Sequence, residues 1–271
     1  MKISRKSFIS KLFFGALGFI ALDAFWFEKY VVDWTIYDIS KNETDKIKVL
    51  QLSDLHLHKI KSFHRTIAKR INKENPDALL ITGDSINYTS ELSILDEFLK
   101  LIDHHILKIA TLGNKEYEGR IDFDTLRSVY EVNNGMLLIN QNHVLNIKNR
   151  AINIMGIDDY LAGNANYFMA SQNVNTSLDT IVLNHRPEYR DEIDSINKSL
   201  KIPLKLILCG HTHGGQVTFF GKVIFKPNGS GRYLKGWYKS DESLMYVSRG
   251  IGTSIIDVRF GARAEASIFY V

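Results

Sequence analysis

Five short apolar segments, each ending in a polar residue, constrain the fold of this 271-residue chain more than any other feature. They span residues 47–54, 77–84, 106–114, 179–185 and 204–211, and stretches with helical spacing separate the first three. Continuous apolar strands that alternate with helices are typical of a sheet buried on both faces. The sequence therefore predicts an α/β fold in which layers of helices cover the sheet.

The polar residues at these segment ends are of types that bind metal ions. They are Asp54, Asp84, Asn114, His185 and His211, and two of the segments continue with a second histidine two positions later, His56 and His213. Because ligands bind beyond the carboxyl ends of strands in such sheets, we expect the seven side chains to meet at one edge. In extended chain, residues i and i+2 face the same side, so each close pair could reach one place. Seven donors exceed the three or so that one catalytic ion needs, which predicts two ions sharing a carboxylate.

Each of these residues, taken alone, has a simpler interpretation. A single histidine is commonly a surface or core group, and a single aspartate can cap a helix or stabilise a turn. Asp158 and Asp159 also end an apolar segment, and we interpret them as loop carboxylates, with a role near the predicted metal site as the alternative. We interpret the other histidines as surface residues: His58, His64, His104, His105 and His143. Only the joint pattern favours metal binding.

The first 30 residues predict a membrane segment. Four basic residues (Lys2, Arg5, Lys6 and Lys11) precede an apolar run over 12–27 that only Asp23 interrupts. Sixteen residues is short for a spanning helix, which needs about 20, and no clean cleavage site follows. SRKSFISK resembles a twin-arginine export signal with a lysine in place of the second arginine. We interpret 1–30 as an anchor or uncleaved signal and 45–271 as a domain outside the cytoplasm, since positive charge stays inside.

The charge of the rest of the chain argues against nucleic-acid binding, and the single cysteine excludes an internal disulfide. Beyond those four residues, 30 Lys and Arg (34 − 4) balance 30 Asp and Glu, which argues against nucleic-acid binding. Cys209 rules out an internal disulfide and follows an apolar run, so we expect a buried, unreactive thiol. The sequence indicates no protein partner.

Five motifs in order carry a family resemblance: LSDLHL, GD, GNKE, LNHRPE and GHTHGGQ. Together they resemble the calcineurin-like metallophosphoesterases over nearly everything after residue 45. GRYLKGWY, YVSRGIGTS and FGARAE are similar to the small membrane-anchored bacterial phosphodiesterase branch. The resemblance implies a four-layer α/β/β/α sandwich with a two-metal site.

The resemblance also implies roles for the seven residues. Asp54, His56 and His213 would hold one ion, Asn114, His185 and His211 the other, and Asp84 would bridge them. A hydroxide between the ions would attack phosphorus in line. The mixed nitrogen and oxygen donors suit Mn²⁺, Fe²⁺, Zn²⁺ or Mg²⁺, with Mn²⁺ favoured.

Lys115 stands where the family commonly has a histidine that contacts the phosphate, and we expect it to act there as a phosphate clamp or a proton donor. The expected function is a phosphodiesterase or pyrophosphatase acting on a phosphoester, which the membrane segment suggests is lipid-linked. One alternative is a UDP-diacylglucosamine pyrophosphohydrolase of lipid A synthesis, since these similar enzymes carry arginine there, although their substrate is cytoplasmic. Another is a non-catalytic, membrane-tethered binder of phosphorylated ligands.

Three weaker candidates for substrate contact remain. Arg249 and Arg232 could bind phosphate, with surface salt bridges as the alternative. The segment VTFF (217–220) could contact an acyl chain, although an ordinary half-buried strand is the favoured interpretation.

Overall fold

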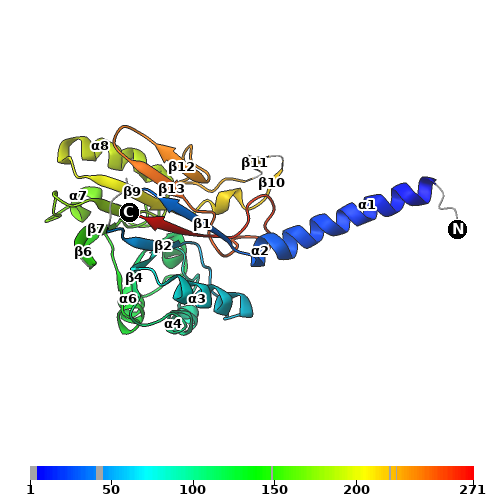
Figure 1. The fold of residues 1–271 in the computed structure, drawn as a ribbon, viewed down its shortest axis with the longest axis horizontal. Helices are drawn as coiled ribbons and strands as arrows, with labels where there is room; N and C mark the ends of the chain where they lie inside the picture. Colours follow the sequence, from blue (N-terminus) through cyan, green and yellow to red (C-terminus); the bar gives the residue numbers. More distant parts are fainter. Residues whose placement is uncertain (1–4, 41–44, 148, 220, 224) are drawn as a thin grey trace.

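Two six-stranded sheets packed against each other form the centre of the fold (Figure 1). The structure is a computed structural model that describes residues 5–40, 45–147, 149–219, 221–223 and 225–271. The first sheet has the order β1-β14-β2-β3-β4-β5. Its strands are β1 (Asp33–Asp38), β14 (Glu265–Tyr270), β2 (Lys48–Leu52), β3 (Ala78–Thr82), β4 (Leu107–Thr111) and β5 (Gly135–Leu137).

The second sheet has the order β12-β13-β9-β8-β7-β6. Its strands are β12 (Gly236–Lys239), β13 (Leu244–Val247), β9 (Leu204–Cys209), β8 (Thr180–Leu183), β7 (Arg150–Gly156) and β6 (Gln141–Ile147). The central pairs of both sheets are parallel, while β14–β2, β12–β13 and β6–β7 are antiparallel. A short hairpin of β10 (Thr218–Phe219) and β11 (Lys222–Val223) stands apart from both sheets.

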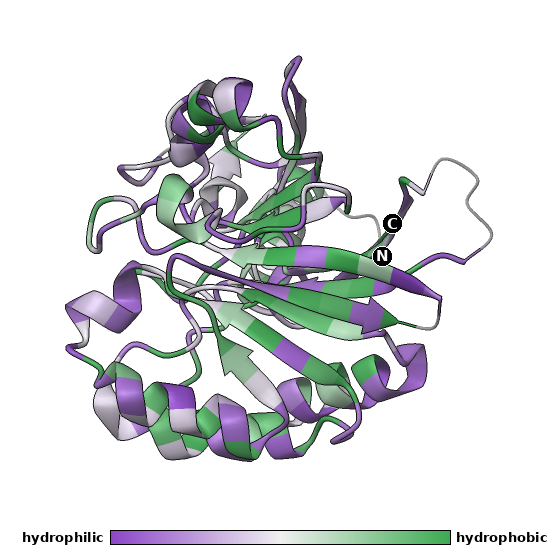
Figure 2. Cartoon of the chain, turned by 90° about the vertical axis from the view of Figure 1, so that its left-hand side faces the viewer, coloured by the Kyte–Doolittle hydropathy of each residue, from purple (hydrophilic) through white to green (hydrophobic). Residues whose placement is uncertain are grey.

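Alternating side chains of the strands build separate apolar cores. In β2, Leu50 and Leu52 pack toward helices α3 (Ser62–Glu74), α4 (Leu92–Lys100) and α6 (Phe123–Val132). Val49 instead joins residues such as Ile181 in the core between the two sheets. A third core lies between the second sheet and helices α7 (Tyr167–Ala170) and α8 (Arg190–Leu200). Figure 2 shows the mainly hydrophobic strands covered by helices of mixed hydropathy. The expected α/β/β/α layering is confirmed.

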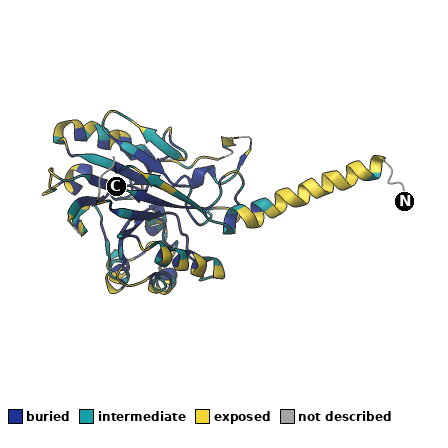
Figure 3. Ribbon diagram, viewed as in Figure 1, coloured by how far each residue is buried: buried dark blue, intermediate teal, exposed yellow. Residues whose placement is uncertain are grey.

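The N-terminal helix leaves the domain and continues outward. It comprises α1 (Arg5–Leu22), a π-helical turn (Asp23–Phe27) and α2 (Glu28–Tyr30). By length and composition, Arg5–Tyr30 is the one helix of the described residues that could cross a membrane, although a signal sequence has the same properties. Its apolar side chains are exposed along α1 (Figure 3).

The folded domain begins before the expected boundary at residue 45. Strand β1 pairs in parallel with β14, from Asp33 opposite Glu265 to Asp38 opposite Tyr270. The base of the helix also packs on the domain, because the backbone N–H of Arg259 donates to the carbonyl of Ala24. The sequence missed this because β1 is only half-buried and joins a strand more than 200 residues later.

Candidate metal centre

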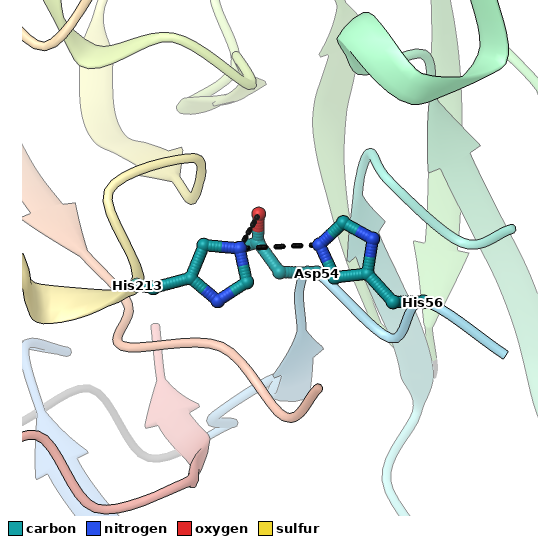
Figure 4. Close-up of side chains that lie close together, drawn as sticks. All are labelled: Asp54, His56 and His213. Atoms are coloured by element: carbon teal, nitrogen blue, oxygen red, sulfur yellow. Dashed lines mark hydrogen bonds and ion pairs between the residues drawn. The ribbon is translucent and has the colours of Figure 1, made fainter. Parts of the chain in front are cut away.

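The seven residues singled out in the sequence form one continuous cluster beyond the carboxyl ends of strands from both sheets. The Nε2 atom of His213 lies 3.6 Å from Oδ1 of Asp54 and 3.1 Å from Nε2 of His56 (Figure 4). Two histidines flank Asp84: His56 Nε2 is 3.7 Å from its Oδ2, and His185 Nε2 is 3.5 Å from its Oδ1. The cluster continues through His185 to Asn114 Oδ1 at 3.3 Å and to the ring of His211, 5.0 Å away between centroids.

The backbone reaches this arrangement through left-handed turns and not through extended chain. Strands β2 and β9 end two residues before the first aspartate and histidine, so the expected alternation of i and i+2 does not explain the pairs. Asp54, His56, Asp84, His211 and His213 all have φ between 44° and 70°. Such conformations cost about 1–3 kcal/mol each outside glycine and cluster at functional sites. This backbone strain therefore indicates that the loops keep these conformations because they position the side chains of the cluster.

Hydrogen bonds on the outer side orient three of the four imidazoles. His185 donates through Nδ1 to the carbonyl of Thr82 at 2.8 Å, and His56 donates through Nδ1 to Oδ1 of Asn87 at 2.7 Å. These bonds leave each Nε2 lone pair directed into the cluster. His211 is held the other way round, with Nε2 donating to the carbonyl of Asn228 at 2.8 Å, which leaves Nδ1 as the free nitrogen. Imidazoles that bind metals are usually fixed by such an outer bond.

The pKa shifts of His211, His213 and Asp84 favour the forms that bind metal, whereas the pKa values of Asp54 and His185 are raised. Burial, helped by His185 and the Arg186 guanidinium, lowers the pKa of His211 to about 3. Burial and neighbouring cationic groups also hold the pKa of His213 well below its usual value. Burial raises the pKa of the Asp84 carboxyl, but the charges of His185 and His56 more than offset this and lower it overall. Neutral imidazole and ionised carboxylate are the ligand forms.

The donor set fits divalent ions on geometry as well as chemistry. The ligand atoms within each of two triads lie within 4.8 Å of one another; the triads are Asp54, His56 and His213, and Asp54, Asp84 and His185. All of these side chains are buried. Imidazole nitrogens and carboxylate oxygens gathered this closely in a buried place need a cation to offset the carboxylate charge.

Glu116, which the sequence analysis missed, fastens two of the ligand-bearing loops together. Its buried carboxylate accepts the N–H groups of Asp84, Ser85 and Gly113 at 3.1, 2.7 and 2.8 Å. Burial and the nearby Asp84 charge raise the pKa of Glu116 to about 7. The only sequence signal was its place in GNKE, directly after a predicted strand.

Arg186 and Arg259 are two further buried residues beside the cluster. Nη1 of Arg186 lies 3.1 Å from Nε2 of His211, and its Nε donates to both carboxylate oxygens of Asp159 at 2.9 Å. Asp159 is therefore close to the site, as the alternative interpretation held. Arg259 donates to several carbonyls and, at 3.4 Å, to Nδ1 of His213. Arg186 belongs to LNHRPE and Arg259 directly precedes FGARAE, but Asp159 and His213, which they contact, are distant from them in sequence.

The other candidates are placed as follows. Lys115 lies at the lip, its N–H bonded to Oδ1 of Asp84 at 2.8 Å and its amine paired with Glu118. Arg249 pairs with Glu265 and Asp33, and Arg232 pairs with Asp191, so the salt-bridge interpretation describes both. These ion pairs argue against a role in phosphate binding for either arginine.

The interpretation of His64 as a surface residue is wrong, because only 8% of it is exposed and burial lowers its pKa to about 4. Cys209 is buried as expected, and burial raises the pKa of its thiol to about 12.

Comparison with known proteins identifies the family. Residues 47–215 match the model of the calcineurin-like phosphoesterases. An uncharacterized metallophosphoesterase of Bacillus subtilis, YkuE, is 28% identical over 99% of this chain and 97% of its own length. The phosphodiesterase YaeI of Escherichia coli is 28% identical over 84% and 83%. A solved archaeal phosphodiesterase aligns at 14% identity with a TM-score of 0.42, covering 75% of this chain and 84% of its own. The chain therefore belongs to the calcineurin-like phosphoesterase family and is a metal-dependent hydrolase of phosphoester bonds.

Proposed function

We propose that the chain hydrolyses a phosphodiester or pyrophosphate with two divalent ions held by the seven clustered residues. In this proposal Asp54, His56 and His213 hold one ion, and Asn114, His185 and His211 the other. The observation that carries the proposal is the position of Asp84. Its two oxygens face histidines of different sets, His56 at 3.7 Å and His185 at 3.5 Å, as a bridging carboxylate requires.

The ions and the protein side chains have different roles in the proposed reaction. Two divalent ions at such a site supply a nucleophile at neutral pH and offset charge on the phosphate oxygens. The imidazoles and carboxylates fix the positions of the ions. Lys115 adds a cation at the lip, and we assign it the role of a clamp on non-bridging phosphate oxygens. Mn²⁺ is the ion we favour, since the donors mix nitrogen and oxygen.

The space around the site favours a diester over a monoester. Two cavities of about 650 and 620 Å³ meet beside the cluster. Lys115 and Glu118 line both of them. A diester carries two substituents on phosphorus, and each cavity offers room for one. The similarity to a phosphodiesterase supports the same choice.

We also propose that residues 1–30 anchor the domain, with the domain outside the cytoplasm. The exposed apolar helix supports the anchor, and the basic residues ahead of it support the orientation.

Metal content and hydrolysis test the proposed function together. The full chain, purified with Mn²⁺, should carry close to two ions and hydrolyse bis(p-nitrophenyl) phosphate. His185→Gln should lower the metal content toward one ion and reduce kcat/KM by at least about 100-fold, because such ions stabilise the transition state by several kcal/mol. The matched control is His105→Gln, since His105 is exposed and bonded only to Asn75 among the contacts described. At most one ion in wild-type protein under metal-replete conditions would overturn the proposal.

The same protein should be screened against monoesters and a UDP-linked lipid. Preference for the UDP-linked lipid would favour the lipid A alternative, and metal binding without any hydrolysis would favour the binder.

A further inference from the structure

One of the two cavities is lined by residues of the metal cluster together with apolar side chains, which form its apolar wall. This cavity, of about 620 Å³, is bordered by Asp84, His211 and His213 on the cluster side. Its lining also includes Phe225, Ile255 and Ile256, and the two isoleucines line the other cavity as well. A phosphate bound at the cluster would therefore have one of its substituents next to apolar side chains. The phosphate group itself does not need apolar side chains for binding.

The loop that carries Ile255 and Ile256 exposes both side chains to solvent, and its backbone is strained at Ile255. Ile255 is 83% exposed and Ile256 is 52% exposed. Ile255 also has φ +64°, a conformation that is strained for a β-branched residue. The side chain of Gln216 holds the loop in place through bonds to Ser254 and Ile256. Ile255 is both strained and exposed, in a loop that hydrogen bonds hold in place. This combination indicates that its apolar surface has a functional role.

The same loop is fastened to the base of the N-terminal helix. Lys29 of α2 pairs with Asp257, and the N–H of Arg259 donates to the carbonyl of Ala24 at 3.1 Å. The β10–β11 hairpin, with Phe219 61% exposed, lies at the same end of the domain as α2 (Figure 1). Phe220 of the VTFF segment lies outside the described residues. The apolar wall thus adjoins the point where an apolar, exposed helix leaves the domain (Figure 3).

We propose that the substrate is a phosphodiester bearing an alkyl or acyl chain, taken from the lipid surface that the anchor enters. Its chain lies in the apolar cavity against Ile255, Ile256 and Phe225, while its phosphate lies at the metal cluster. Hydrolysis forms a bond between phosphorus and a water oxygen and breaks the bond from phosphorus to the leaving alcohol. One proton of the water ends on that alcohol oxygen. This inference rests on the proposed phosphodiesterase activity and names its substrate class.

Two esters with the same leaving group test the proposal. The full chain, in phosphatidylcholine nanodiscs with Mn²⁺, is assayed with p-nitrophenyl octyl phosphate and p-nitrophenyl ethyl phosphate. Each methylene moved from water into an apolar site contributes up to about fourfold in affinity. The octyl ester has six more methylenes, so with partial burial its kcat/KM should exceed that of the ethyl ester by at least about tenfold.

Variants of the wall should lower this octyl-to-ethyl ratio. Ile256→Ser and Phe225→Ser should each reduce the ratio by about fivefold or more. Ile255→Gly should reduce it as well without lowering Tm, because glycine removes the apolar group and relieves the backbone strain together. The matched control is Phe168→Ser on α7, since Phe168 is 57% exposed, close to the 59% of Phe225, and is not among the residues that line the cavity.

The outcomes separate the inference from the proposed function. A wild-type ratio near one, an unchanged ratio in the wall variants, or an equal fall in Phe168→Ser would each overturn the inference while the phosphodiesterase activity stands. Failure of the wild type to hydrolyse either ester would overturn the proposed function, and the inference with it.

Discussion

Replacement of Lys115 tests how the site handles the phosphate. Its amine is paired with Glu118, whose side chain is 54% exposed. An ion pair this exposed contributes about 0.2–1 kcal/mol, so the amine can leave Glu118 for a phosphate oxygen at little cost. A hydrogen bond from a charged group contributes about 1.5–3 kcal/mol. Lys115→Ala should therefore lower kcat/KM by about 10- to 150-fold.

The leaving group distinguishes a clamp from a proton donor. A clamp stabilises non-bridging oxygens whichever alcohol departs, so Lys115→Ala should slow nitrophenyl and alkyl phosphodiesters by similar factors. Lys115→Arg should retain much of the activity, since it keeps the charge. A proton donor matters most for a poor leaving group. A loss confined to alkyl esters would refute the clamp and identify Lys115 as the donor, and no loss on either substrate would remove it from the mechanism.

Glu118→Gln is the matched companion to this experiment. The change removes the charge that holds Lys115 but keeps an oxygen for Nδ2 of Asn114, which now donates to Oε1 of Glu118 at 2.8 Å. We expect kcat/KM to rise by up to about fivefold, the factor that corresponds to losing an exposed ion pair. A fall of tenfold or more would show that Glu118 acts on the metal ligand and not on Lys115.

Three further predictions follow from the site, the buried histidine and the anchor. Asp84→Asn should disturb both ions, because the bridge loses its charge, and elemental analysis should find less than one ion per chain. The pKa of His64 is depressed by burial and by Lys61, so the folded state binds fewer protons than the unfolded state between about pH 4 and 6.5. The free energy of unfolding should thus fall as pH decreases through this range, by about 1–2 kcal/mol after allowance for partial solvent screening, and His64→Gln should remove this contribution in urea titrations. A reporter that is active only outside the cytoplasm should be active when fused to Val271, and a silent, stably expressed fusion would reverse the orientation.

The sequence predicted the layered fold and the clustered residues because both depend on local patterns. Apolar runs such as 77–84 reveal buried strands, and neighbouring parallel strands place their carboxyl ends together, which brings Asp84 near Asp54. His185 follows a strand of the other sheet and comes within 3.5 Å of Asp84 because the two sheets pack together. The prediction erred on how Asp54 and His56 reach the site, since left-handed turns leave no clear signature in residue types other than glycine.

The supporting contacts could not be predicted from local patterns. Arg259 reaches carbonyls on the loop after β13 and lies beside His213, 46 residues away in sequence. His64 follows a polar helical pattern, yet it is buried against Phe98 of the neighbouring helix. Contacts of this kind depend on how the elements pack, and the spacing of residues along one element does not specify it.

The position of β14 in the first sheet determines when that sheet can be completed during synthesis. The last strand of the chain lies between β1 and β2, the first two strands of the fold, and pairs with both. Among the described strands, β1 pairs with β14 alone, and β2 has only β3 as a neighbour until residues 265–270 are made. Until then, β1 and the helix that precedes it are not joined to the rest of the first sheet. The first sheet is therefore completed only after residues 265–270 are made, and a chain lacking them would keep an open edge on β2.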